Sequence, residues 1–257
     1  ARAREAVSGG QARGEMEIIQ RAMTQPVAVP EAKTPFRFYT SFVLQKATGL
    51  RAATLPQLVT LLRKVPDGCI YYHTHYFLLT HHYLTPEPPN DFAYWVTEVL
   101  GEERLGELLA GMDIMEHSTL QSLREALVGT IEEYLTNTPA AKLRFASEGE
   151  EFFFVKSVHV VMPTSHQASM LAEFAEALSR VSIHSLYFHI FDARLRVGRR
   201  TNDFAIWLDE HLGLKDLADN VANLDPYAHT LETLRSLLLS MVQHELDRQG
   251  TVHAKPG

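Results

Sequence analysis

The densest group of chemically capable side chains in this 257-residue sequence lies between residues 70 and 83, where histidines and tyrosines are interspersed. The four histidines are His73, His75, His81 and His82. Because neutral imidazole is a frequent ligand of transition metals, this stretch raises the hypothesis of a metal site. Two ligands on one helical face are expected three or four residues apart, whereas these histidines are two apart or adjacent. A metal held by His75, His81 and His82 would therefore need ligands from elsewhere in the chain.

Part of this stretch recurs later in the chain. Ile70-Tyr71-Tyr72-His73 matches Leu186-Tyr187-Phe188-His189, at an offset of 116 residues (189 − 73). The following motif, Asn-Asp-Phe-Ala-x-Trp, begins at Asn90 and again at Asn202, at an offset of 112 (202 − 90). Ordered matches at nearly constant offsets indicate an internal duplication, which decides the expected architecture.

The matched side chains have a structural interpretation that does not involve catalysis. They are His73, Asp91 and Trp95 in the first half, and His189, Asp203 and Trp207 in the second. Asn and Asp before an apolar pattern cap the start of a helix, and the tryptophan follows on its apolar face. A buried imidazole needs a hydrogen-bond partner, and the aspartate of the same half is the natural candidate. We expect both sets to hold helices together.

One basic cluster follows the second histidine motif. Its members are Arg194, Arg196, Arg199 and Arg200. The ordinary interpretation is a solvated helix end and loop, and the alternative is a contact with an anion or an acidic partner. A net charge of −7 argues against nucleic-acid binding, which needs a basic face. No phosphate-binding loop, dinucleotide fingerprint or nucleophile elbow is present, and the single Cys69 excludes an internal disulfide.

The elements that position these residues are expected to be mainly helical. Apolar residues at helical spacing predict about five helices in each half. Phe36 to Leu44 and Phe152 to Val161 are extended candidates that could pair with each other. The predicted fold class is therefore mainly α, with two pseudo-symmetric helical repeats and room for one short strand per repeat.

The expected domain organisation follows the repeat and the polar stretches. It comprises an N-terminal tail (1–33), helical repeat 1 (34–137), a linker (138–150), helical repeat 2 (151–248) and a disordered C-terminal tail (249–257). No apolar run approaches the roughly 20 residues that span a bilayer, and no signal segment is evident. We expect a soluble, cytoplasmic protein that does not bind membranes.

At Ile70-Tyr71-Tyr72-His73, at Asn90 to Gly101 and at Leu224-Asp225-Pro226-Tyr227, the chain resembles an uncharacterised family of bacterial and archaeal proteins. That family is known as a domain of unknown function, and its pattern is aliphatic-Tyr-x-His, Asp-Phe-x-x-Trp, then Leu-Gly. The resemblance covers about residues 36–135 and 152–246. It implies a small helical module, in some members encoded near enzymes of storage-carbohydrate metabolism, and supplies no catalytic residues.

These observations favour a non-catalytic interaction or regulatory module that binds a protein partner or self-associates. No cofactor is expected in that case. The first alternative is a metal-dependent enzyme that uses His73, His75, His81 and His82. The second alternative is a sensor of a small molecule or anion, with a pocket between the repeats.

Overall fold

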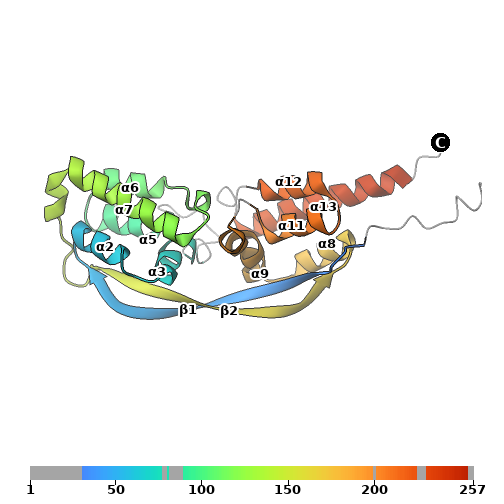
Figure 1. Cartoon of the computed structure of the whole chain (residues 1–257), viewed down its shortest axis with the longest axis horizontal. Coiled ribbons are helices and arrows are strands. Elements are labelled where there is room, and N and C mark those ends of the chain that lie inside the picture. Colours follow the sequence, from blue (N-terminus) through green and yellow to red (C-terminus); the bar gives the residue numbers. More distant parts are fainter. Residues whose placement is uncertain (1–30, 77–79, 81–88, 199–200, 225–229, 254–257) are drawn as a thin grey trace, which may run out of the picture.

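The computed structural model describes residues 31–76, 80, 89–198, 201–224 and 230–253. Its central feature is a two-stranded antiparallel ribbon of β1 (Phe36–Ala52) and β2 (Phe152–Ala168). Figure 1 shows an elongated molecule in which this ribbon is bowed along one long side. Two groups of helices lie on the same face of the ribbon, one group at each end. We call these groups the first and the second helical body.

The first helical body follows β1 in the chain. It comprises α2 (Leu55–Leu62), α3 (Asp67–Tyr71), the π-helix η1 (Tyr72–Tyr76), α5 (Asp91–Glu98), α6 (Glu103–Ala110), the 3-10 helix η2 (Ile114–Glu116), α7 (Leu120–Asn137) and the 3-10 helix η3 (Pro139–Leu143). The oxygens of Thr54, Asn90 and Thr119 accept hydrogen bonds from backbone N–H groups of the following first turns. These caps satisfy donors that have no partner within a helix, so they fix where α2, α5 and α7 begin.

The second helical body follows β2. It comprises α8 (Leu171–Arg180), α9 (Ile183–Tyr187), the π-helix η4 (Phe188–Asp192), α10 (Ala193–Val197), α11 (Asp203–Glu210), α12 (Lys215–Ala222) and α13 (Leu231–His253). Asn202 caps α11 as Asn90 caps α5. Helix α13 extends past residue 249 into the stretch expected to be a disordered tail. No helix in the described part of the chain is long and apolar enough to cross a membrane.

Each strand contributes to both helical bodies. Phe36, at the start of β1, packs against Phe174 and Phe204 of the second body. Phe152, at the start of β2, stacks on Phe92 of the first body with ring centroids 4.9 Å apart. Since each strand begins in one body and ends in the other, the ribbon ties the two bodies together.

The predicted fold class is wrong. The molecule is a mixed α/β protein whose two strands are each 17 residues long, not a mainly α protein with short strands. The two expected pseudo-symmetric helical repeats are not shown as separate units either, because each body's core includes aromatic residues from the other half's strand. Pairing between the two extended segments, in contrast, is confirmed, with Phe36 opposite Ala168 and Ala52 opposite Phe152.

Polar residues and a proline concealed the length of the strands. Gln45 to Gly49 in β1 resembles a loop, and Pro163 interrupts the apolar pattern of β2. In a two-stranded ribbon both strands are edge strands, so proline is tolerated where its nitrogen faces away from the partner. Gly49 adopts φ 77° beside the irregularity between Ala47 and Arg51, which suits a residue without a Cβ.

Candidate functional site

His73 connects a helix of the first body to the opposite strand. Its Nδ1 lies 2.7 Å from the carboxylate of Asp91, and its Nε2 accepts a hydrogen bond of 3.0 Å from the backbone N–H of Val155. Because Nε2 accepts, the ring proton must be on Nδ1, where it is donated to the carboxylate. Both ring nitrogens are therefore occupied in the folded protein.

His189 makes the corresponding contacts in the second body. Its Nδ1 lies 2.7 Å from Asp203, and its Nε2 accepts from the backbone N–H of Tyr39 at 2.8 Å. Burial lowers the pKa of His189, and Asp203 opposes that effect only in part. The imidazole is thus held neutral as a bridge between helix and strand, and it has no free nitrogen for proton transfer or metal binding.

The two predicted tryptophans hold the chain at the entrance of each strand. Trp95 donates from Nε1 to the carbonyl of Glu150 at 2.8 Å, and Trp207 donates to the carbonyl of Thr34 at 2.9 Å. Both rings are almost fully buried. Together with the histidines, they attach β1 to the second body and β2 to the first.

A buried polar cluster that the sequence did not indicate lies where the two bodies meet. Tyr71 donates a hydrogen bond of 2.7 Å to Asp192 of the second body, and Tyr187 donates to the backbone carbonyl of His75. Burial raises the pKa of Asp192 to about 6 and lowers that of His75 to about 3. His75 and Asp192 belong to the π-helices η1 and η4, and such turns often occur at functional sites. Their effect here is to join the bodies through polar contacts.

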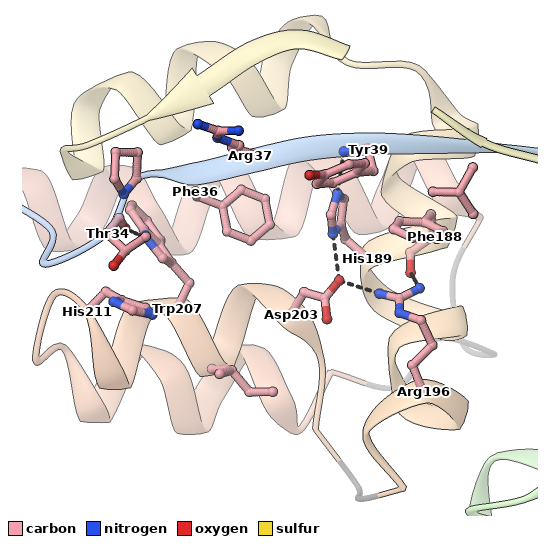
Figure 2. A pocket seen from close by; sticks show the side chains of 13 residues that line it. Thr34, Phe36, Arg37, Tyr39, Phe188, His189, Arg196, Asp203, Trp207 and His211 are labelled. Carbon is pink, nitrogen blue, oxygen red and sulfur yellow. Dashed lines mark hydrogen bonds and ion pairs between the residues drawn. The ribbon is translucent and has the colours of Figure 1, made fainter. Parts of the chain in front are cut away.

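A cleft of about 620 Å³ opens beneath the start of β1 in the second body (Figure 2). It combines residues of both halves of the chain: Thr34, Pro35, Phe36, Arg37, Tyr39, Val161, Phe188, His189, Arg196, Asp203, Ile206, Trp207 and His211. Aromatic rings form much of the wall, and the His189–Asp203 pair lies in the middle (Figure 2). The volume is in the range of small-molecule sites.

The charges in this cleft are largely compensated. Arg196 forms an ion pair with Asp203 and lies over the ring of Phe188, 3.8 Å from its centroid. Arg37 points to the other side of β1 from Phe36 (Figure 2). A ligand would therefore meet an aromatic surface and two arginines, of which Arg196 already shares its charge with a carboxylate.

The predicted arginine cluster does not form one site among the described residues. Arg194 donates to the carbonyl of Ala222, away from the ion pair that Arg196 makes with Asp203. Arg199 and Arg200 lie outside the described residues. Of the four arginines, Arg196 alone lines the cleft of Figure 2 in the part of the chain that is described.

The predicted metal ligands are placed only in part. His75 is buried, and its Nδ1 lies 3.0 Å from the hydroxyl of Thr74. His81 and His82 fall outside the described residues. Within the described ranges, no group of three or more His, Cys, Asp or Glu side chains is arranged to hold a metal ion.

One face of the ribbon, opposite the buried Ser41 and Ser157, carries a row of exposed apolar side chains, and at its edge the ring of Phe42 lies 6.0 Å from that of His184 in α9. They are Phe42 (46% exposed), Leu44 (57%), Val158 (40%), Val160 (40%) and Met162 (42%), and we call them the outer ribbon patch. In the register, Phe42 is opposite Val160 and Leu44 is opposite Val158. Cross-strand partners share a face, so these side chains form one surface. The sequence did not indicate this surface, because only one short strand per repeat was predicted.

The fold and its sites define a class of protein in which one long β-ribbon joins two helical bodies. The chain belongs to a family of unknown function, DUF5752, whose model matches residues 33–243. A similar solved structure is that of OrfY from Thermoproteus tenax, with 32% sequence identity and a TM-score of 0.71. The similarity covers 83% of this chain and 96% of that one. No curated protein matches the chain.

Proposed function

We propose that this protein is a non-catalytic interaction module that binds a protein partner, or a second copy of itself, through the outer ribbon patch. The observation that carries the proposal is the exposure of Leu44 and its neighbours at the centre of a 17-residue ribbon. Single exposed apolar residues are ordinary, but a contiguous apolar surface marks an interaction site.

The arrangement of the ribbon supports this function. Ser41 and Ser157, which alternate with the patch residues, are buried on the face toward the helices, whereas the patch residues are exposed. Figure 1 shows the uncovered face bowed away from both bodies. An open apolar face of a sheet is stabilised when another element covers it.

The repeated motifs fit this proposal as the supports of the docking surface. His73 and His189 each anchor a strand to a helix by a backbone hydrogen bond, and the tryptophans fix the strand entrances. A rigid surface loses less conformational entropy when it binds, which favours affinity. In this proposal the Tyr-x-His and Asn-Asp-Phe-x-x-Trp motifs keep the ribbon in shape and do not react with a substrate.

The deciding experiment uses three forms of the full chain as baits for affinity purification from the native host. Bound proteins are identified by mass spectrometry and then tested again as purified components. Leu44→Ser with Val160→Ser removes the centre of the outer ribbon patch. Leu143→Ser with Phe145→Ser, at and after the end of η3, changes two other exposed apolar residues and is the matched control.

We expect the patch variant to lose a partner that the wild type and the control variant retain. Sedimentation velocity on the same three proteins gives the equivalent test for self-association. Because all four substituted residues are exposed, both variants should keep the fold, which circular dichroism checks. If all three proteins show the same partners and the same oligomeric state, the proposal is wrong.

The cleft of Figure 2 favours a second candidate function, the sensing of a small organic anion. Arg196 supplies the charge and Phe188 the aromatic surface. Calorimetric titration with small aromatic carboxylates would show binding that Arg196→Met weakens at least tenfold. Arg180→Met is the control, since this exposed arginine of α8 also pairs with a carboxylate but does not line the cleft. Equal affinities for both variants would exclude Arg196 as the anion contact.

A further inference from the structure

We infer that the occupant of the outer ribbon patch is an acidic amphipathic helix of another protein. This inference rests on the proposed function, because it names the partner of the same surface. Three observations support it: the charge of the ribbon, a pair of facing lysines beside the patch, and the dimensions of the uncovered face.

The ribbon carries a net positive charge, whereas the rest of the chain carries a net negative charge. Neither β1 nor β2 contains an aspartate or a glutamate, and together they carry Arg37, Lys46, Arg51 and Lys156. The strands therefore have a formal charge of +4, while the whole chain has −7, which leaves −11 (−7 − 4) for all other residues. A surface with this sign selects partners of opposite charge.

Two of these cations are registered next to the apolar side chains, and the stem of Lys156 also lies against α3, where a Cβ on Gly68 would be 3.1 Å from Lys156 Cγ. Lys46 is directly opposite Lys156 in the ribbon, one cross-strand step beyond the Gln45–Ser157 pair. Like charges in directly opposed positions destabilise a sheet. Arg51 has an ion pair with Glu151 at 3.2 Å, but no ion pair is found for either lysine within the described residues. An acidic group from a partner would relieve this repulsion.

The dimensions of the uncovered face fit one helix. Two strands about 4.8 Å apart form a surface roughly 10 Å wide, which is about the diameter of an α-helix. The apolar stretch from Val158 to Met162 extends for about 13 Å, which about nine helical residues would cover. An amphipathic helix could therefore cover the outer ribbon patch with its apolar stripe and place acidic residues beside Lys46 and Lys156.

Two other occupants fit less well. A second copy docked face to face would bring the lysine pairs of two ribbons toward each other, which opposes association. Anionic membranes are usually recognised by clusters of about four to eight basic residues, whereas in the described part of the chain Lys46 and Lys156 are the basic residues registered next to the patch. Both occupants are nevertheless outcomes of the test.

The test uses three helix-stapled 18-residue peptides with leucine along one face and glutamate, glutamine or lysine at the other positions. Fluorescence anisotropy measures their binding to the full chain at low and physiological salt. We expect the glutamate peptide to bind at least tenfold more tightly than the glutamine peptide, with added salt reducing the difference. The lysine peptide should bind most weakly.

Charge reversal on the protein gives the reciprocal test. Lys46→Glu with Lys156→Glu should invert the order, so that the lysine peptide binds more tightly than the glutamate peptide. Lys142→Glu with Lys215→Glu, at exposed positions on η3 and α12, is the matched control and should preserve the wild-type order. If the order of the peptide affinities stays the same when Lys46 and Lys156 are replaced, the inference is wrong.

The outcomes separate the inference from the proposed function. If all three peptides bind equally and Leu44→Ser with Val160→Ser abolishes binding, the interaction surface stands and the acidic partner is wrong. If the protein self-associates and Leu44→Ser with Val160→Ser abolishes this self-association, the interaction surface again stands and the acidic partner is wrong. If no peptide binds but vesicles of 30% phosphatidylserine in phosphatidylcholine retain the protein through Lys46 and Lys156, the surface binds a membrane and both proposals fall.

Discussion

The hydroxyl group of Tyr71 donates a hydrogen bond of 2.7 Å to the carboxylate of Asp192, and this bond joins the first helical body to the second. Asp192 is 6% exposed, and its other oxygen, Oδ2, has no hydrogen-bond partner among the described residues. A carboxylate with so few donors is costly to ionise in a buried site, which is why its pKa is raised to about 6. The junction of the two bodies should therefore respond to pH.

Asp192→Asn should remove this pH response. The folded-state pKa of about 6 lies above the usual value of 3.8, so the free energy of unfolding falls as the pH rises from about 4 to 6, and the loss is complete above pH 6. That loss, about 3 kcal/mol when complete, is relieved as the pH falls from 6 toward 4. Urea unfolding at pH 4.5, 6 and 7.5 should show that the free energy of unfolding of the variant increases relative to that of the wild type as the pH rises. Asp209→Asn, at an exposed position, is the control, and a pH-independent difference for Asp192→Asn would contradict the prediction.

Tyr71→Phe should destabilise the protein by about 1–3 kcal/mol, because the buried carboxylate loses its donor. The hydrogen bond from Tyr71 lowers the pKa of Asp192, so its loss raises that pKa further and the destabilisation should be larger at pH 7.5 than at pH 4.5. Tyr187→Phe is a matched comparison, since the Tyr187 hydroxyl donates to the backbone carbonyl of His75. A backbone carbonyl does not titrate. Equal pH profiles for the two variants in urea unfolding would refute the role of Asp192.

His75→Phe should stabilise the protein in acid. The pKa of buried His75 is lowered by burial to about 3 from the usual value of 6.5, so protons bind preferentially to the unfolded chain between these values. Stability is therefore lost as the pH falls from 6.5, by about 3 kcal/mol at pH 4. Phenylalanine suits the position, because Phe191 stacks on Tyr187 at 4.5 Å much as His75 stacks on Tyr71 at 5.5 Å.

Thermal unfolding between pH 4 and pH 7.5 checks this prediction. The variant and the wild type should differ by less than about 1.5 kcal/mol at pH 7.5, where the loss of the Thr74 contact opposes the gain in apolar burial. Below pH 5 the variant should unfold at a higher temperature than the wild type. A wild type that is as stable as the variant at pH 4 would show that His75 does not titrate as proposed.

His189→Phe should expose one particular backbone amide. The variant keeps a ring in the aromatic cluster but removes the nitrogen that accepts from the Tyr39 N–H. Hydrogen exchange at Tyr39 should accelerate at least tenfold, which corresponds to about 1.4 kcal/mol of lost protection. Val155 should be unaffected, because its acceptor is His73. His73→Phe should give the reverse result, and equal acceleration at both amides would indicate general loosening.

Sequence patterns found the side chains that hold the structure but not their full sets of partners. Asn and Asp at the first turns of α5 and α11 are recognisable because capping is a local property. The backbone acceptor role of His73 and His189 is not recognisable, since it depends on strands more than 80 residues away in the first case and 150 in the second. The Tyr71–Asp192 bond, which spans 121 residues, was missed for the same reason.

The strands were harder to predict than the helices because their environment is unusual. Exposed Leu44 and Val160 lie on a face that no helix covers, so apolar and polar residues do not alternate as they would in a half-buried strand. The extent of β1 and β2 is decided by their mutual pairing, which is a long-range property. The outer ribbon patch could not be inferred until the uncovered face was known.

Gly68 illustrates the same limit and gives a direct test of how β2 packs on the first body. It lies within α3, where a Cβ would be 2.7 Å from the backbone carbonyl oxygen of Ser157, a close approach that the local sequence does not reveal. Ser157 also donates from its hydroxyl to the carbonyl of Gly68 at 2.9 Å, so helix and strand are in close contact here. A methyl group would push them apart.

Gly68→Ala should therefore reduce the free energy of unfolding by about 1–3 kcal/mol, the usual range for overpacking a close contact. Gly129→Ala is the matched control, because this glycine lies in α7 with nothing within 4 Å of a Cβ, and alanine there should stabilise the helix by about 0.5–1 kcal/mol. Urea unfolding of the two variants measures both effects. If Gly68→Ala is as stable as Gly129→Ala, then β2 can move away from α3 freely, and the ribbon is not the rigid docking surface that the proposed function requires.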